Sequence, residues 1–362
     1  MSQAIARAFV ALIVGAALLM SLAATAQSPA PPTTAPTGKV PDDPARGMKA
    51  STEVSTAKGS TAIPGWNSPP KSWNAASGTP QYASIPGRET NVLIQAEGRE
   101  WRELRNGPLT TYGGWLIGLA FFAVLGFYIV KGTIRVKETP TGRLIERFNA
   151  VERASHWTMA ITFVILALTG AVILWGKYLV LPWLGYGAFS WVQIVGKNIH
   201  NFIGPLFIFS LLTTFLLYVK DNLFSTWDVK WFASLGGWLR HVPSYKFNAG
   251  EKMVFWGGLV FLGAVIGGTG LILDFPNWNQ TRAFMQEANV IHAIAAVCFI
   301  SLIIGHAYLG TIGMAGAFHA MRVGTVDETW AKEHHGLWYE EVKEGKRPEH
   351  YVAPATQPAT GD

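Results

Sequence analysis

The chain has 362 residues, of which 49% are hydrophobic and only 14% charged, whereas a soluble domain carries roughly 25% charged residues. Together with 15 tryptophans, this composition indicates a membrane protein. The net charge of +6 is spread over several segments instead of one patch, which argues against nucleic-acid binding. The single cysteine, Cys298, excludes a disulfide framework, a CxxCH haem attachment and a cysteine-ligated iron–sulfur cluster.

The N-terminal segment has the pattern of an exported protein. Residues 1–26 combine an arginine, an apolar stretch and a small-residue site ending at Ala26, which predicts a cleaved signal peptide, with an uncleaved anchor helix as the alternative. Residues 27–111 begin with a stretch rich in Pro, Ser and Thr and without apolar periodicity, which predicts a periplasmic tether followed by a membrane-proximal segment.

Five apolar stretches of bilayer length follow, each near the 20 residues that a spanning helix needs. They cover residues 112–130, 157–175, 200–219, 253–273 and 290–312. We therefore expect an all-α membrane protein in which the helix at 112–130 precedes a core of four transmembrane helices.

The charges between these helices predict the orientation. The loops at 131–153 and 220–252 are basic, and basic loops stay in the cytoplasm. A periplasmic N-terminal segment and a cytoplasmic C-terminus satisfy this rule in the inner membrane. Arg99, Arg102 and Arg105 are exceptions on the exported side, which a signal peptide that has already committed the N-terminus overrides.

Four histidines lie within the apolar stretches or at their ends. His292 and His306 are fourteen residues apart, which on one helix means about 20 Å along the axis and only about 40° in direction. His156 begins the second helix at its cytoplasmic end, and His200 begins the third at its exported end. The helix directions therefore predict two level-matched pairs, His156 with His306 and His200 with His292.

A pair of facing imidazoles at each level predicts a b-type haem with two histidine ligands, because no thiol or acidic residue stands close enough on these helices to complete a zinc or copper site. The alternative for each histidine is a hydrogen-bonded packing residue. Glycines on the helices leave room for a flat macrocycle, although Gly263 and Gly267 equally fit ordinary close helix packing. The other histidines are expected to be solvated or interfacial side chains: His241, His319, His334, His335 and His350.

Motifs in the second half of the chain resemble the gamma subunit, a cytochrome b, of membrane-bound formate dehydrogenases. They run from about Arg147 to Val342 and read, in order, RFNAVERASHW, KNIHNFIGPLFIF, KFNAGEKMVFW and WAKEHHGLWYEEV. The resemblance implies a four-helix dihaem core at 147–320 and a cytoplasmic tail at 321–362. It also implies the same four haem-iron ligands in the same pairs. The N-terminal segment and the helix at 112–130 have no counterpart in compact members of the family.

The resemblance further implies a quinone pocket beside the cytoplasmic haem, formed partly by Asn248 and Gly250. An asparagine can hydrogen-bond a quinone carbonyl, and a glycine lets backbone approach a flat ring. The same residues also fit a plain helix start, with Asn248 as the cap and Glu251 at the third position after it. Glu251 and Lys252 are candidate points of proton uptake, or else ordinary interfacial charges.

By this resemblance the chain anchors a respiratory formate dehydrogenase of anaerobic respiration, taking electrons from an iron–sulfur beta subunit and reducing menaquinone or ubiquinone. Formate oxidation would reside on a molybdenum- or tungsten-containing alpha subunit, so no catalytic residue for it is expected here. The alternatives are the cytochrome b of a membrane-bound hydrogenase or related oxidoreductase, a histidine-based proton-relay transporter, and a haem-free anchor. Acidic residues confined to helix ends and loops argue against the transporter.

Overall fold

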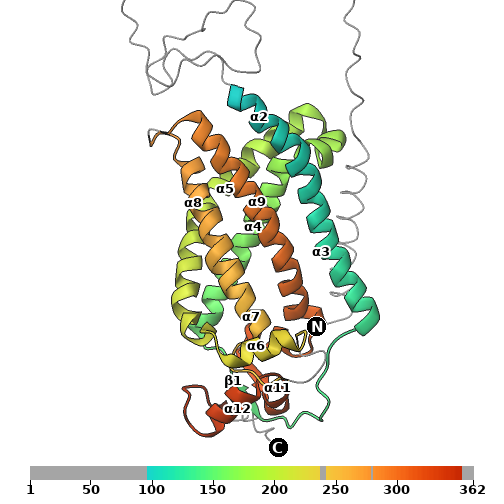
Figure 1. The fold of residues 1–362 in the computed structure, drawn as a ribbon, viewed down its shortest axis with the longest axis vertical. Helices are drawn as coiled ribbons and strands as arrows, with labels where there is room; N and C mark the ends of the chain where they lie inside the picture. The colour runs from blue at the N-terminus through green and yellow to red at the C-terminus, as the bar shows by residue number, and fades with distance from the viewer. Residues whose placement is uncertain (1–95, 237–241, 279, 353–362) are drawn as a thin grey trace, which may run out of the picture.

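The computed structural model of the chain describes residues 96–236, 242–278 and 280–352 (Figure 1). The predicted signal peptide, the predicted tether up to residue 95, and His241 lie outside the described residues. Within the described part, five helices are long and apolar enough to cross a membrane, so the expected all-α membrane fold is confirmed. These candidate spans are Gly98–Lys131, Ala150–Leu179, Leu181–Asn222, Ala249–Asp274 and Arg282–Gly313.

The first span begins before the predicted residue 112. Helix α2 (Ala96–Leu104) continues through a short π-helical stretch, η2 (Arg105–Leu109), into α3 (Thr110–Lys131). Pro108 lies inside η2. Proline has no amide to donate to a helical ladder, and a local π-helical turn is a common way to absorb such an interruption. The charged segment before the apolar stretch therefore extends the helix.

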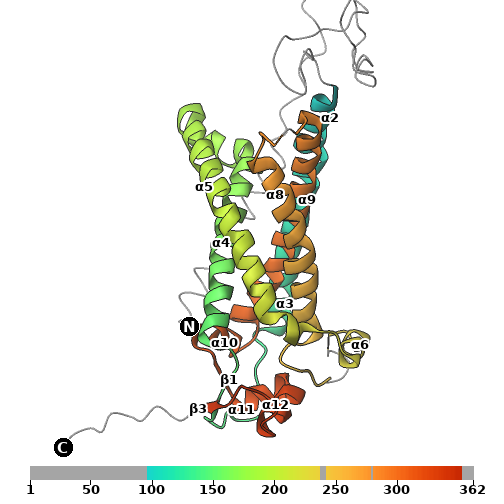
Figure 2. The same cartoon turned by 90° about the vertical axis from the view of Figure 1, so that its left-hand side faces the viewer.

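Helix α4 (Ala150–Leu179) begins at a capping box. Asn149 Oδ1 accepts hydrogen bonds from the amides of Val151 and Glu152, and Glu152 Oε2 accepts one from the Asn149 amide. Because the first amides of a helix have no partner within the helix, these bonds determine where α4 starts. Helix α5 (Leu181–Tyr218) is interrupted at Gly185, whose φ is +68°, and then runs back along α4 (Figure 2).

The fourth span consists of α7 (Ala249–Met253), a π-helical stretch η4 (Val254–Leu262) and α8 (Gly263–Asp274). A Cβ added at Gly263 would collide with Leu211 of α5, and one at Gly267 would lie 3.4 Å from Ile208 Cγ1. These two glycines therefore let α8 and α5 approach closely, as in small-residue helix packing.

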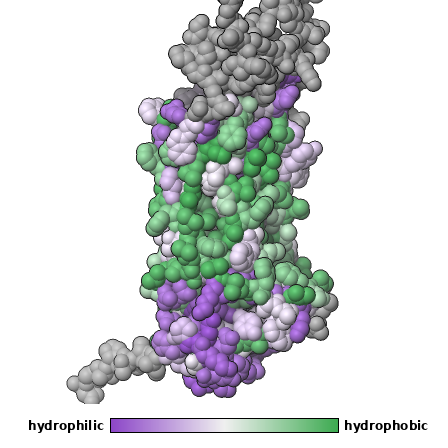
Figure 3. Space-filling view, turned by 60° about the vertical axis from the view of Figure 1, so that its left-hand side comes forward, coloured by the Kyte–Doolittle hydropathy of each residue, from purple (hydrophilic) through white to green (hydrophobic). Residues whose placement is uncertain are grey.

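The fifth span, α9 (Arg282–Tyr308) with η5 (Leu309–Gly313), packs against both α8 and α3. Trp175 Nε1 of α4 donates to the carbonyl of Thr110 at 2.9 Å, and its side chain lies in a small core with Ile117 and Val297. The N-terminal helix is therefore a packed member of the bundle. On the face shown in Figure 3, apolar residues form a broad belt over the middle of the bundle, and most of the hydrophilic residues lie at one end.

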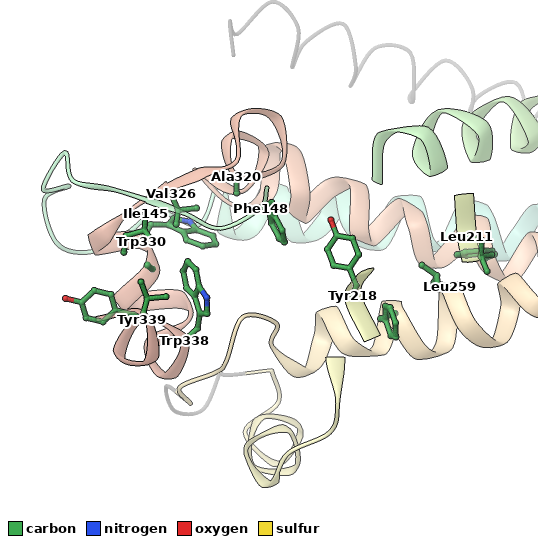
Figure 4. Close-up of a cluster of buried hydrophobic side chains, with 14 of the residues drawn as sticks. Ile145, Phe148, Leu211, Tyr218, Leu259, Ala320, Val326, Trp330, Trp338 and Tyr339 are labelled. Atoms are coloured by element: carbon green, nitrogen blue, oxygen red, sulfur yellow. The ribbon is translucent and has the colours of Figure 1, made fainter. Parts of the chain in front are cut away.

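The C-terminal segment folds against this polar end. It contains α10 (Ala317–Val323), β2 (Thr325–Asp327), α11 (Glu328–His334), α12 (Gly336–Lys343) and β3 (Tyr351–Val352). Strand β1 (Leu144–Glu146) pairs antiparallel with both β2 and β3, and Ile145 lies opposite Val326 and Tyr351. Between sheet and helices, Trp330 and Trp338 are buried with Ile145 (Figure 4). We call this end of the bundle the tail end and the opposite end the far end.

Candidate functional site: two histidine pairs

The first pair of histidines lies toward the far end. His200 on α5 and His292 on α9 have ring centres 6.2 Å apart and ring planes at 71°. His200 Nδ1 lies 2.9 Å from Thr169 Oγ1, and His292 Nδ1 lies 3.0 Å from Thr269 Oγ1. Each ring is thus held through Nδ1, which leaves Nε2 as its free nitrogen.

The second pair lies toward the tail end. His156 on α4 and His306 on α9 also have ring centres 6.2 Å apart, with ring planes at 54°. His156 Nδ1 is buried and has no hydrogen-bond partner among the described residues. Packing of α4, α5 and α9 therefore brings the four histidines into the two pairs that helix direction predicts.

The centre-to-centre distance has a chemical meaning. Two imidazoles bound to opposite sides of one metal, with metal–nitrogen bonds of about 2.0 Å and about 1.1 Å from nitrogen to ring centre, have centres about 6.2 Å apart. Both pairs match this value. Among the described residues, no three His, Cys, Asp or Glu side chains gather to bind a bare metal ion. The residues therefore fit a group that supplies the four remaining ligands itself, as haem does.

A cavity of about 380 Å³ surrounds the far-end pair, within the range of about 300–1,000 Å³ typical of ligand pockets. Its wall is mostly apolar and includes Gly170, Gly204 and Gly270, where no side chain blocks the space. Two cationic side chains, Arg105 and Lys197, and one acidic side chain, Asp274, also line it. An apolar slot with cationic groups suits a flat ring with carboxylate substituents, so the residues fit haem here.

The loop around Asn248 and Gly250 has a definite structural role. Asn248 Oδ1 accepts the amide of Glu251 at 3.0 Å, and Glu251 Oε2 accepts the amide of Asn248 at 2.8 Å, so the predicted cap of α7 is confirmed. A Cβ at Gly250 would lie 3.0 Å from the ring of Trp231, on α6 (Thr226–Ala233). The group that lies close to Gly250 is therefore the ring of Trp231, from the same chain.

Comparison with known proteins identifies the family of the chain. A family model described as prokaryotic cytochrome b561 matches residues 147–324. The nitrate-inducible formate dehydrogenase cytochrome b556(Fdn) subunit of Escherichia coli K12 is 30% identical over 213 residues, which is 56% of this chain and 94% of that protein. The chain belongs to this cytochrome b family. Two further relatives extend the comparison.

The formate dehydrogenase cytochrome b556(fdo) subunit of the same strain is 29% identical, over 55% of this chain and 93% of its own length. The cytochrome b556 subunit of formate dehydrogenase from Haemophilus influenzae is 26% identical, over 54% of this chain and 83% of its own. The family model starts at residue 147, after α2 and α3. Arg105 of η2 nevertheless reaches the cytochrome b cavity, and its guanidinium donates to the Ile173 carbonyl at 2.9 Å.

One histidine of this cytochrome b contradicts the sequence-based expectation. His335 was expected to be a solvated or interfacial side chain, but only 2% of it is exposed. Its Nε2 lies 2.9 Å from Arg147 Nη2, and its Nδ1 lies 2.7 Å from the Tyr245 carbonyl. Since an arginine only donates, Nε2 accepts and Nδ1 carries the hydrogen. Burial and the neighbouring Arg147 lower the pKa of His335 to about 3, so the ring is neutral.

Arg147 joins this histidine to the capped loop. Its Nη2 also donates to the carbonyl of Lys246 at 2.7 Å and to Glu251 Oε1 at 3.1 Å. Lys252, the other candidate for proton uptake, is buried: only 1% of its side chain is exposed, and its Nζ lies 2.9 Å from Asp228 Oδ2. An exposed interfacial charge is therefore not a description that fits Lys252.

Lys246 is the centre of a buried ionic cluster. Its Nζ lies 2.8 Å from Glu152, 3.0 Å from Glu349 and 3.3 Å from Asp221. Burial acts to lower the pKa of Lys246, but the three carboxylates outweigh it and raise that pKa. Arg347 binds Asp221 and Glu349 from the other side. The segment around Arg347 and Glu349 is thereby tied to the start of α4 and to the end of the third span.

Several residues of the site carried no individual signal in the sequence. Thr169 and Thr269 could have been found from a recurrence, because a Thr-Gly pair stands at 169–170 and again at 269–270, each on the helix that precedes a histidine-bearing helix. His335 and Arg147 are 188 positions apart, and nothing local links them. Trp231 lies on the short helix α6 between two spans, so its place over Gly250 depends on the tertiary fold.

Proposed function

We propose that this cytochrome b binds two b-type haems, one between His200 and His292 and one between His156 and His306, and passes electrons through the membrane to a quinone. The observation that carries the proposal is the 6.2 Å separation of ring centres in both pairs, which equals the spacing of two trans imidazoles on one metal. Haem bound at these positions would supply reversible one-electron chemistry.

The spacing of the pairs supports a transmembrane path. His292 and His306 lie on one uninterrupted helix, α9, so their backbones are about 20 Å apart along its axis. That distance is a large part of a hydrocarbon core of about 30 Å. Between the pairs, α9 contributes an apolar stretch that includes Ala295, Val297 and Phe299, all buried. This packing excludes water from the path.

We place the tail end in the cytoplasm of a bacterial cell and the far end at the periplasmic face. The basic residues of 131–153 and 220–252 support this orientation in the inner membrane. The electron donor would then be an iron–sulfur subunit on the periplasmic side, in a complex whose molybdenum- or tungsten-containing subunit oxidises formate. The names of the relatives as formate dehydrogenase subunits favour this donor over that of a hydrogenase.

The quinone site belongs at the tail end, beside His306 and the Asn248 loop. Asn248 uses Oδ1 as a helix cap, so its amide nitrogen is the group available to donate to a quinone carbonyl. Glu251 is about one-third exposed and its carboxylate is bound to Arg147, which makes it the candidate for taking up a proton from the solvent and passing it to a reduced quinone. Menaquinone and ubiquinone both carry the required carbonyls.

The first experiment is a reduced-minus-oxidised visible spectrum of the purified chain, combined with a pyridine haemochrome assay. We expect two b haems per chain, with one lost in His200→Ala and the other in His306→Ala. His319→Ala, an exposed histidine at the tail end, serves as the matched control and should keep both. Correctly inserted protein without a b-type spectrum would reject the proposal and favour a haem-free anchor or a proton relay.

A further inference from the structure

The far-end histidines are each held by a threonine in the same way. Thr169 on α4 contacts His200 on α5, the helix that follows it, and Thr269 on α8 contacts His292 on α9, the helix that follows it. The distances from oxygen to Nδ1 are 2.9 and 3.0 Å. Two separate helix hairpins therefore repeat one side-chain arrangement around a single cavity.

The direction of these hydrogen bonds follows from the other partner of each threonine. Thr169 Oγ1 lies 2.8 Å from the Ile165 carbonyl, and Thr269 Oγ1 lies 2.6 Å from the Val265 carbonyl. A carbonyl only accepts, so each hydroxyl hydrogen is donated along its own helix. The hydroxyl oxygen must then accept from the histidine, which places the hydrogen on Nδ1. Nε2 of both rings is left with its lone pair facing the cavity.

The glycine after each threonine completes the arrangement. A Cβ added at Gly170 would lie 3.4 Å from His200 Cε1, and one at Gly270 would lie 3.4 Å from His292 Cε1. A methyl group at either position would just touch the edge of the ring, and any longer side chain would displace it. The threonine determines the tautomer, and the glycine leaves the space that the ring edge occupies.

The tail-end pair differs at His156, which lacks this hydrogen bond. His156 Nδ1 is buried without a hydrogen-bond partner among the described residues, and the only ring contacts found there for His156 are with Trp157 and His306. An acceptor at Nδ1–H makes the imidazole a stronger electron donor through Nε2. A stronger donor stabilises the oxidised, more positively charged iron and lowers its reduction potential.

We propose that Thr169 and Thr269 are positioning residues that hold His200 and His292 in the metal-binding tautomer and set the reduction potential of the far-end haem below that of the tail-end haem. This inference rests on the proposed haem binding by the same histidines. Electrons arriving at the far end then move to the higher potential at the tail end. The difference in hydrogen bonding gives the chain an internal direction of electron flow.

A potentiometric titration of the two b haems in Thr169→Val, Thr269→Val and the double variant tests this inference. Valine keeps the shape of threonine and removes the acceptor. We expect both haems to be retained, with the component that is absent in His200→Ala shifted to higher potential. A tenfold change in its reduced-to-oxidised ratio at fixed potential corresponds to about 59 mV for one electron. The component absent in His306→Ala should not move.

Thr162→Val is the matched control. Thr162 is buried on the same helix and donates to the Thr158 carbonyl at 2.8 Å, as Thr169 does to Ile165, and it does not line the cavity. It should leave both potentials unchanged. Thr169→Ser retains the hydroxyl and should restore the wild-type potential.

Retention of both haems with no shift in Thr169→Val and Thr269→Val would overturn the inference, as would an equal shift of both components. If Thr169→Val loses the far-end haem, Thr169→Ser decides: recovery of that haem at the wild-type potential supports the role of the hydroxyl, and continued loss rejects it. Failure of haem binding in the wild type would instead reject the proposed function, so the two failures are distinguishable.

Discussion

Arg147 and His335 are 188 positions apart in the chain and lie 2.9 Å apart in the structure, with the guanidinium donating to Nε2 of a neutral imidazole. The bond joins the residue just before the first core helix to the C-terminal segment. Arg147 also packs on the ring of Trp330, with its Cζ 5.0 Å from the ring centroid. The C-terminal segment is therefore held in place by the buried guanidinium of Arg147, which contacts the rings of His335 and Trp330.

This contact predicts loss of stability in acid. The pKa of His335 is lowered to about 3, whereas an unfolded histidine has a pKa near 6.5. Between these values only the unfolded state takes up the proton, so the stability present above pH 6.5 is lost as pH falls, by about 1.4 kcal/mol per pH unit. Thermal unfolding of the C-terminal segment, followed by tryptophan fluorescence at pH 7 and pH 5, measures the effect.

His335→Gln should flatten this pH dependence because glutamine does not titrate in the range. The exposed His319, in the same segment, provides the control, and His319→Gln should keep the wild-type slope. Equal slopes in the wild type and His335→Gln would show that another group is responsible.

Lys246→Met should destabilise the protein by about 3–5 kcal/mol, the range for removing one partner of a buried ionic group. Three carboxylates lie within 3.3 Å of its Nζ, and methionine would leave them facing one another with only Arg347 to compensate. Denaturant unfolding in detergent gives the measurement. Lys343→Met removes an exposed lysine with a single long contact to Glu340, and a change above about 0.5 kcal/mol there would contradict this account.

Gly324→Ala should cost about 3 kcal/mol. Gly324 has a φ of +102°, and an added Cβ would lie 2.5 Å from the Phe148 carbonyl oxygen and collide with Arg153. Left-handed strain contributes about 1–2 kcal/mol and the collision about 1–3 kcal/mol.

Gly345→Ala separates the two contributions to this cost. Gly345 has a φ of +70° and open space around it, so it should show the strain alone, about 1 kcal/mol. The comparison is made by thermal unfolding of both variants. Similar losses in the two would mean that the close approach at Gly324 is relieved without cost.

Cysteine labelling tests the orientation of the bundle. In a Cys298→Ala background, Lys177→Cys at the end of α4 and Lys343→Cys in α12 both place a thiol at an exposed position. A membrane-impermeant maleimide should label Lys177→Cys in intact spheroplasts and Lys343→Cys only after the membrane is opened. The reverse pattern would place the tail end outside the cell and would invert the proposed direction of electron flow.

Some features of the fold follow directly from patterns along the chain. Five apolar stretches of bilayer length predicted the five long helices found among the described residues, although the helix bounds extend further because polar turns continue the same helices. The cap at Asn248 was visible as Asn248 with Glu251 three residues later, because capping is a local interaction. The histidine pairs could be proposed because helix direction and rise determine depth in the membrane.

What the amino-acid sequence alone determined is therefore the membrane class, the candidate spanning helices of the described residues and the level of each histidine along them. Hydrophobicity and helical rise both follow from the order of residues along the chain. Only the tertiary structure decided the 6.2 Å ring separation in each pair, the two threonine contacts at Nδ1 and the burial of His335. These depend on how closely helices approach and rotate about their axes. Helix packing sets both quantities through contacts between residues far apart in sequence, and no local pattern encodes them.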